Sequence, residues 1–400
     1  MEGLRENRKW LSVVGCMLLM MCGLGIAYNS TSVLIHPICE SLEFDRGPFN
    51  ITRSIILGMT ALTMPFYGKM VPVIGYRRVF LIGILGIFVA TFGYSMCGTL
   101  SQFYLCSVVH GFFYNALHFI SVGLLMNALF GIRQGVPVAI TAAGSGFGAA
   151  IMSPIVADFA ARFGWRAGYR LAACVALFIA VPVIFFLIKE PSGAARQDVE
   201  KNEKENTKAQ TSVFSDRNVY YLSLITFIVG TMSVVLSGLL AAMLSDIGYS
   251  SRFAALASSA MFILLIVNKL MLGFLYDRLS MNIANLFFIV GTIITPVMGL
   301  FLHKIPALVI FLVGASIVCS GVSVVVSVLS KRYFLNNYQK VFSIASTACS
   351  VGTAVGMPIA GYIFDICGNY TMLWYIFAAM ALCMAGAIIL LERRREKGNV

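Results

Sequence analysis

Long apolar stretches alternate with short polar connections along almost the whole chain. A helix needs about 20 apolar residues to cross a bilayer, and twelve stretches of this kind can be marked out. They cover residues 10–38, 52–72, 77–97, 101–129, 135–161, 165–189, 218–243, 253–275, 281–302, 306–330, 339–365 and 369–391. Because unpaired backbone polar groups cannot face lipid, each stretch is predicted to be a helix. The pattern predicts an all-α membrane protein with twelve transmembrane helices.

A polar segment divides this pattern in the middle. Residues 190–217 are rich in Glu, Lys, Asn and Gln and poor in aromatic residues, as is typical of a solvated linker. Six apolar stretches precede the segment and six follow it. We therefore predict an N-terminal six-helix bundle over 1–189, a cytoplasmic linker over 190–217 and a C-terminal six-helix bundle over 218–400.

The two halves share glycine and proline landmarks at a nearly constant offset. Gly68 begins the loop after the second stretch, and Gly273 begins the loop after the eighth, 205 residues later. Pro154 and Gly164 recur as a pair 204 residues further on. This agreement predicts a duplication, with two pseudo-symmetric bundles related by an axis along the membrane normal.

Composition and charge agree with a membrane protein. The chain is 59% hydrophobic and 12% charged, with a mean hydropathy of +0.87. One set of loops holds 21 Lys and Arg residues and the other set holds 7. The positive-inside rule then places both termini and the linker in the cytoplasm, in a multi-pass protein of the plasma or inner membrane. Anionic lipid accounts for the net charge of +12, so no nucleic-acid partner is expected, and the expected state is a monomer.

Lys269 is the lysine or arginine that lies well inside an apolar stretch. An ammonium in hydrocarbon costs about 2.5–3.5 kcal/mol on insertion scales. The residue therefore predicts a water-filled cavity or an anionic partner. The alternative is a structural lysine whose stem extends towards Asp277, eight residues or about 12 Å away.

The fourth stretch carries a polar stripe. His110, Tyr114 and His118 recur every four residues and share one face of a helix. They either line a cavity or are satisfied residues of a core, and the pattern leaves both open. The first stretch adds further polar candidates for a cavity or an outer gate, which are Tyr28, Asn29 and His36.

Small residues and prolines mark the fifth and eleventh stretches. Such residues let helices approach closely, and they also weaken a helix where rocking needs a hinge. The two interpretations are compatible. The candidates for packing or hinge positions are Gly144, Gly146, Gly148, Pro154, Gly356 and Pro358.

The chemistry of the buried positions excludes several classes. The ten cysteines form no CxxC pair, and neither a metal site nor a cofactor is expected. No nucleophile with a base, and no pair of buried carboxylates, supports an enzyme. The lack of deep carboxylates disfavours cation efflux, and organic phosphates usually need two or more arginines. A transporter of a neutral metabolite, another efflux pump and a non-transporting membrane sensor stay open as alternatives.

The loops after the second and eighth stretches resemble a signature of the major facilitator superfamily. The first loop matches its Gly-x-x-x-Asp-x-x-Gly-x-Arg-Arg/Lys pattern except at Pro72, where the acid belongs. In that superfamily the loops act as a gating latch, and tight turns with inside-positive charge are the plainer interpretation. The residues that the resemblance assigns to the latch are Gly68, Gly75, Arg77, Arg78, Gly273, Asp277 and Arg278.

Within that superfamily, residues 44–55, 143–154 and 163–166 resemble the monocarboxylate transporter and oxalate/formate antiporter group. The resemblance implies that Lys269 pairs with a substrate carboxylate. A second lysine of the oxalate/formate branch has no counterpart in 343–356, and Leu265 replaces the acid of the proton-coupled branch. These departures favour a singly charged substrate and leave the coupling to other residues.

The resulting hypothesis is a secondary active transporter that moves a small organic anion by alternating access. It works by proton symport or by exchange with a counter-anion. The expected substrate-binding residues are Lys269, Tyr28, Asn29, Tyr114 and His118, and the candidates for proton coupling are His110, His118 and His36.

Overall fold

The computed structural model describes residues 2–130, 135–190, 216–334 and 338–397. All regular elements of these residues are helical. The predicted linker therefore lies outside the described residues except at 190, 216 and 217.

The first half of the chain forms a series of helices that includes two interrupted spans. In chain order they are α1 (Glu2–Met20), the π-helical η1 (Met21–Asn29), the 3₁₀-helical η2 (Ser30–Leu34), α2 (Ile35–Leu42), α3 (Arg46–Ile74), α4 (Tyr76–Tyr94), α5 (Leu100–Tyr114), the 3₁₀-helical η3 (Asn115–Leu117), α6 (Phe119–Phe130), α7 (Gly135–Phe163) and α8 (Trp165–Phe186).

The second half repeats this order. Its helices are α10 (Arg217–Gly238), α11 (Leu240–Asp246), α12 (Ser251–Arg278), α13 (Met281–Gly299), α14 (Ile305–Gly321), α15 (Val324–Tyr333), α16 (Tyr338–Cys367) and α17 (Thr371–Lys397). The helices α12, α13, α14 and α15 each begin 205 residues after α3, α4, α5 and α6, respectively. This register confirms two copies of one six-span unit.

Spans one, four, seven and ten are interrupted, whereas the sequence predicted continuous helices there. The break in span four has a visible cause. The Asn115 side-chain amide donates to the carbonyl of Thr60, at 2.6 Å, and to the hydroxyl of Thr63, at 3.0 Å. The hydroxyl of Ser121 donates to the Asn115 carbonyl at 2.8 Å. These bonds hold the polar groups of the turn, so the helix stops and His118 takes an extended backbone.

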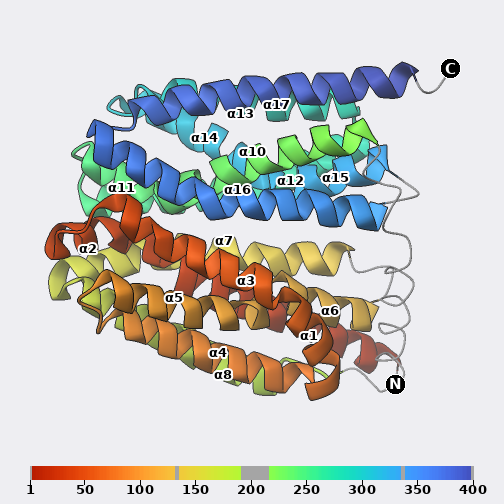
Figure 1. The fold of residues 1–400 in the computed structure, drawn as a ribbon. Helices are drawn as coiled ribbons and strands as arrows, with labels where there is room; N and C mark the ends of the chain where they lie inside the picture. Colours follow the sequence, from red (N-terminus) through yellow and green to blue (C-terminus); the bar gives the residue numbers. More distant parts are fainter. Residues whose placement is uncertain (1, 131–134, 191–215, 335–337, 398–400) are drawn as a thin grey trace. The chain divides into compact units, whose positions relative to one another are not determined.

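Contacts divide the chain into two compact units. Residues 1–44, 55–206 and 250–259 form the first, and residues 45–54, 207–249 and 260–400 form the second. In the first unit η1 lies against α7, and α4 lies beside α8 (Figure 1). In the second unit the main contact joins α10 to α16. The units differ from the predicted bundles in the first turns of α3 and α12, which are equivalent segments of the repeat.

Glycines allow the closest helix approaches in both units. A Cβ at Gly148 of α7 would lie 2.6 Å from the carbonyl oxygen of Met21 in η1. A Cβ at Gly356 of α16 would lie 2.8 Å from the carbonyl oxygen of Thr231 in α10. Such distances are too short for any side chain. Close packing of the first span on the fifth, and of the seventh span on the eleventh, therefore depends on small residues.

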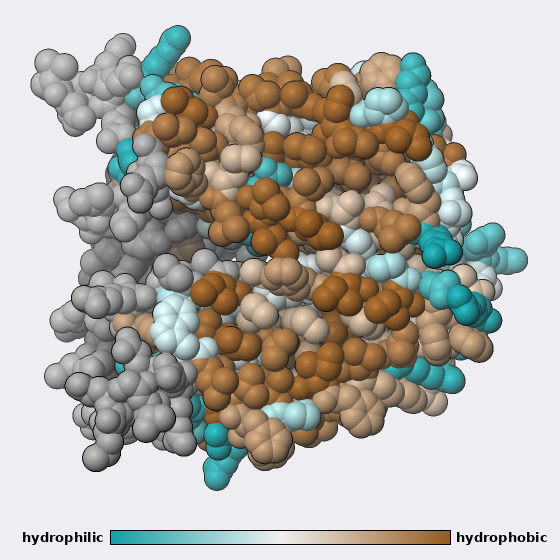
Figure 2. All heavy atoms as spheres, turned by 180° about the vertical axis from the view of Figure 1, so that it is seen from behind, coloured by the Kyte–Doolittle hydropathy of each residue, from teal (hydrophilic) through white to brown (hydrophobic). Residues whose placement is uncertain are grey.

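The helix surfaces suit a lipid environment. Eleven helices or helix pairs are long and apolar enough to cross a membrane among the described residues, and α3 is not one of them. Large apolar side chains point outwards, as at Phe178 and Phe186, which are 76% and 79% exposed. Figure 2 shows hydrophobic residues covering most of the face in view, with hydrophilic residues mainly at its edges. Serine and threonine hydroxyls inside the helices donate to carbonyls one turn earlier, as Ser153 does to Ala149 at 2.6 Å.

Candidate functional site

Lys269 lies well inside α12, in the second unit, and its side chain is partly buried. Among the described residues it forms neither a hydrogen bond nor an ion pair. An ammonium with no counter-charge, two-thirds of the way along an apolar helix, is unfavourable in the absence of water or an anion.

The surroundings of Lys269 come from three helices of the second unit. The Asn268 side-chain amide donates to the hydroxyl of Ser316 at 2.7 Å, which fixes α12 to α14 next to the lysine. Cys319, one turn further along α14, is an electrostatic neighbour of Lys269. The Cys319 thiol donates to the carbonyl of Ser233 in α10 at 3.6 Å. These bonds join α12, α14 and α10 next to Lys269.

The polar residues expected from spans one and four gather into one aromatic cluster of the first unit. The ring centroid of Tyr114 lies 5.4 Å from that of Tyr28 and 5.7 Å from that of His110. His118 stacks on Tyr114 with centroids 4.8 Å apart. His110 and Tyr114 are buried, whereas Tyr28 and His118 are partly exposed. The π-helical turns of η1 present Tyr28 to this cluster, and the break after Tyr114 turns His118 onto its ring.

The other candidates of span one lie outside the cluster's ring contacts. Asn29 is the last residue of η1 and is partly exposed. His36 lies in α2, and its Nε2 atom is 3.6 Å from a carboxylate oxygen of Glu40 one turn later. His36 is thus placed with the end of the span, apart from His110 and His118.

The loop before α4, predicted to act in gating, is held by a carboxylate from another part of the chain. Gly75 begins α4 with φ 98°, a conformation that favours glycine. The backbone N–H of Arg77 donates to Glu190 at 2.8 Å, and its Nε donates to the carbonyl of Ile188 at 2.8 Å. Glu190 therefore supplies an acid at this helix N-terminus, although Pro72 stands at the acidic position of the signature. Arg78 is exposed.

The second segment predicted to act in gating is described only in part. Gly273 lies inside α12, and a Cβ there would meet no atom within 4 Å. The side chains of Asp277 and Arg278, like the surroundings of Gly68, lie outside what the structure describes. Just before them, the Tyr276 hydroxyl donates to Asn285 at 2.6 Å, and Asn285 donates to Glu392 at 2.5 Å. This network joins α12 to α13 and α17.

The packing and hinge candidates all lie within unbroken helices. Gly144 and Gly148 contact the backbone of α1 and η1, and Gly146 is buried. The helix α7 continues through Pro154, as α16 continues through Pro358. Gly148 and Gly356 each face a backbone carbonyl of a neighbouring helix. The interruptions lie instead in spans one, four, seven and ten.

A buried charge cluster escaped the sequence analysis. The Arg46 guanidinium donates to Asp246 at 2.7 Å, and these side chains are only 8% and 6% exposed. The Tyr370 hydroxyl donates to the other Asp246 oxygen at 2.9 Å. The two oxygens of Asp365 accept the backbone N–H groups of Arg46 and Gly47, at 2.8 and 2.6 Å, and so cap α3. Burial, and then the Asp246 carboxylate, raise the pKa of the Tyr370 phenol, so it stays a donor.

The sequence analysis also misplaced Arg53. Arg53 was counted among the seven Lys and Arg residues of the outer loops, but it lies two turns inside α3 and is 7% exposed. Arg46 and Arg53 belong to the second unit, as Lys269 does. Nothing in the sequence indicated that Arg46 and Arg53 are buried in a helix, because the predicted span began at residue 52, whereas α3 begins at Arg46.

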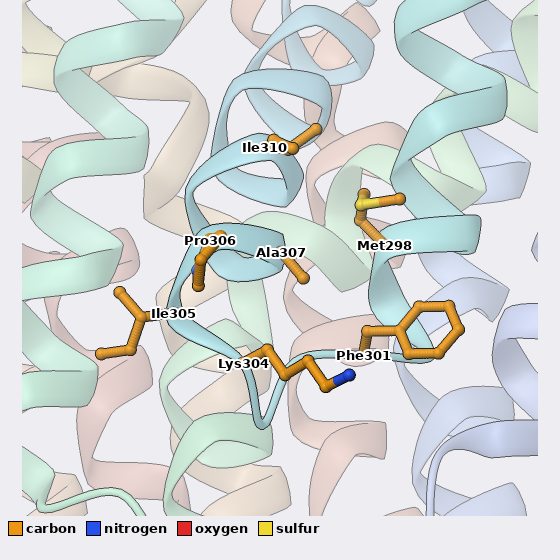
Figure 3. A pocket seen from close by; sticks show the side chains of 7 residues that line it. All are labelled: Met298, Phe301, Lys304, Ile305, Pro306, Ala307 and Ile310. Atoms are coloured by element: carbon orange, nitrogen blue, oxygen red, sulfur yellow. The ribbon is translucent and has the colours of Figure 1, made fainter.

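Two surface hollows of the second unit lie away from Lys269. The larger, of about 570 Å³, is apolar and lies between the ends of α13 and α14; Figure 3 shows Lys304 at its edge. The smaller, of about 290 Å³, is lined by Asp246, His303 and Tyr370 among others. Neither hollow includes a residue expected to bind substrate.

Comparison with known proteins identifies the fold. The family model of the Major Facilitator Superfamily matches residues 16–228 and again residues 222–400. A bacterial homolog of the human lysosomal transporter Spinster, in an inward-facing and occupied conformation, has a TM-score of 0.68 and 13% identity, over 95% of this chain and 93% of that one. The nucleoside transporter NupG has a TM-score of 0.73 and 14% identity, over 95% and 99%. No curated protein sequence gives a significant match.

Proposed function

The chain belongs to the major facilitator superfamily of membrane transporters, and we propose that it is a secondary active transporter of a small organic anion, a monocarboxylate, that works by alternating access. The observation that carries this proposal is Lys269, a partly buried ammonium in mid-helix that has no hydrogen bond or counter-charge among the described residues.

A bound carboxylate would remove the cost of this arrangement. Closing a cavity around an unpaired ammonium leaves a charge in a medium of low dielectric constant, which is strongly unfavourable. A carboxylate neutralises the charge and accepts hydrogen bonds from the ammonium. Binding therefore makes closure favourable with the substrate and unfavourable without it, which is the condition for coupled transport.

The number of cations without a partner among the described residues favours a substrate with a single carboxylate. Arg46, a buried cation of the second unit, is already paired with Asp246. Lys269 is a compact point charge, which suits one carboxylate, whereas phosphates are usually held by forked arginine pairs. The donors of the aromatic cluster in the first unit, Tyr28, Tyr114 and His118, together with Asn29, are the proposed hydrogen-bonding partners of the substrate.

We propose that transport of the anion is coupled either to a proton moving in the same direction or to exchange for a second anion. The proposed proton carriers for symport are His110 and His118 in the cluster and His36 near the end of the span, because an imidazole can accept and release a proton. Uptake driven by a pH gradient into anion-free vesicles would identify symport, whereas uptake only into anion-loaded vesicles would identify exchange.

Transport in proteoliposomes tests the role of Lys269. Monocarboxylates are first screened for a ligand-induced rise in thermal stability, and labelled uptake of the best ligand is then measured. A hydrogen bond to a charged group contributes about 1.5–3 kcal/mol, so Lys269→Ala should weaken binding by about 10–100-fold. Lys269→Arg should retain part of the uptake. Lys304→Ala is the matched control, because it removes a lysine of the same unit at a surface hollow. Wild-type uptake by the Lys269→Ala protein would refute the proposal.

A further inference from the structure

Two cysteines of the first unit lie together at the connection between α4 and α5. The Sγ atoms of Cys97 and Cys106 are 3.8 Å apart. Cys97 belongs to the turn and is 3% exposed, whereas Cys106 lies in the second turn of α5 and is partly exposed. A disulfide bond is about 2.0 Å long, so a movement of about 1 Å by each sulfur would join them.

Gly93 makes room for this pair. A Cβ at Gly93 would lie 3.0 Å from the Cys106 sulfur, and the Cys97 thiol donates to the Gly93 carbonyl at 3.4 Å. The Cys106 sulfur therefore lies against the space that a side chain at this position of α4 would take, and the Cys97 sulfur lies against the Gly93 carbonyl. In the second half, the equivalent positions 205 residues later are Leu302 and Phe311, so the thiol pair is particular to the first half.

The backbone around the pair is fixed from several sides. Gln102 accepts the N–H groups of Gly98 and Thr99, at 2.7 and 3.3 Å, and completes a capping box with Thr99 at the start of α5. The Arg166 guanidinium of α8 donates to the carbonyl of Cys97 at 3.3 Å. A turn held in this way keeps the two thiols at a constant distance, which favours reaction between them over reaction with separate partners.

The expected topology exposes this turn to an oxidising side. The turn lies at the opposite end of α4 from Arg77 and Arg78, which the positive-inside rule assigns to the cytoplasm. Disulfides persist outside the cytoplasm. The hydrogen bond with Cys106, and then burial, raise the pKa of the Cys97 thiol, so the more exposed Cys106 is the thiol that reacts first.

The geometry points to a redox modification site, in which Cys97 and Cys106 are oxidised to a disulfide by a small external disulfide. The Cys106 thiolate attacks the reagent, forms a mixed disulfide and releases one thiolate. The Cys97 sulfur then attacks the Cys106 sulfur and displaces the second thiolate. The two cysteines lose two electrons and two protons, and the external disulfide is reduced to two thiols. The product joins the outer turn to α5, the helix that carries His110 and Tyr114.

Peptide mass spectrometry of the purified full-length protein tests this site. The protein is treated with oxidised glutathione, alkylated with iodoacetamide and digested with trypsin. The tryptic peptide over residues 79–133 contains Cys97 and Cys106 and no other cysteine. Oxidised wild-type protein should yield this peptide without alkyl groups and two hydrogens lighter, and reduction before alkylation should restore two alkyl groups. Oxidised protein should also have the higher midpoint of thermal unfolding.

Variants separate an internal disulfide from separate reactions. In the Cys97→Ser protein, Cys106 should be alkylated or joined to glutathione, and no peptide with an internal disulfide should form. The Cys106→Ser protein supplies the same test if the first variant fails to fold. Cys174→Ser, at a partly exposed thiol of α8, should behave as wild type. Modification of the exposed Cys367 by glutathione shows that the oxidant has reacted. If the oxidised wild-type peptide then still carried two alkyl groups or two glutathione adducts, the proposal would be overturned. This outcome is independent of transport activity.

Discussion

The two halves make the same hydrogen bond with different chemistry. In the first half, the Trp165 indole at the start of α8 donates to the Ser41 hydroxyl near the end of α2, at 2.7 Å. In the second half, the Tyr370 hydroxyl next to α17 donates to Asp246 at the end of α11, at 2.9 Å. Each residue of the second pair lies 205 residues after its counterpart, which is the offset of the helices. The bond joins an interrupted span to the last helix of its half in both copies.

The charge of Asp246 is what separates the two copies. It binds Arg46, whereas the position equivalent to Arg46 in the second half is Ser251. The N-terminus of α3 is capped by Asp365 from α16, whereas the first turn of α12 is capped locally, by the Ser250 hydroxyl accepting from the N–H of Phe253 at 3.3 Å. The hydrogen bond belongs to both units, and the buried ion pair is an addition in the second unit.

Lys269 extends this asymmetry. Its counterpart in the first half is Met64, an apolar residue that is 49% exposed. Arg46 and Lys269 are thus both cations of the second unit, at positions where the first unit has the neutral residues Ser251 and Met64. Arg46 has acidic partners and stabilises the fold, whereas Lys269 has none among the described residues. A buried cation without a partner is the better candidate for ligand binding.

Replacing Asp246 by the residue of the other copy should have the largest effect on stability. Asp246→Ser keeps an acceptor for Tyr370 but leaves the Arg46 guanidinium buried without this partner, and breaking a buried pair costs about 3–5 kcal/mol. Unfolding in sodium dodecyl sulfate, followed by circular dichroism, measures the loss. Adding Arg46→Met should recover most of it, because the pair is then replaced by neutral groups. A single variant as stable as wild type would show that the ion pair is not required.

Removing the shared donor in the charged copy should have an intermediate effect. Tyr370→Phe deletes a hydrogen bond to a carboxylate, which contributes about 1.5–3 kcal/mol. The stacking of the ring on Phe364, with centroids 4.7 Å apart, is kept. The same unfolding assay should therefore place this variant between Asp246→Ser and wild type. Additivity of Tyr370→Phe with Asp246→Ser would contradict a shared site, because both changes act on one carboxylate.

The sequence was sufficient for the fold because membrane helices follow from hydropathy alone. The duplication was visible in Gly68, Gly273 and the repeated Pro–Gly spacing, and the helix starts confirm it. Continuous helices in spans one, four, seven and ten were wrong predictions. Their interruptions depend on contacts between distant residues, such as Asn115 with Thr60, which hydropathy does not report.

The candidate site could be anticipated only in part. Lys269, Tyr28, Tyr114 and His118 were chosen as candidates because a polar group within an apolar stretch is unusual, and their role in binding stays a prediction. Arg46, Asp246 and Asp365 were missed because each lies near the end of a predicted span, where charge is ordinary. Their burial comes from residues more than 100 positions apart in the sequence. Applying the 205-residue offset to Asp246 would have paired it with Ser41 and shown the change in charge.

The smallest effect is expected in the neutral copy. Ser41→Ala removes the acceptor of the Trp165 indole, and a neutral hydrogen bond contributes about 0.5–1.5 kcal/mol. Ser41 is exposed, so water can replace its hydroxyl and the lower end of this range applies. In contrast, Ser41→Asp installs the carboxylate of the other copy without an equivalent of Arg46, and it should not stabilise the protein. If Ser41→Ala destabilised the protein as much as Tyr370→Phe in the unfolding assay, the charge on Asp246 could not be the source of the difference between the two copies.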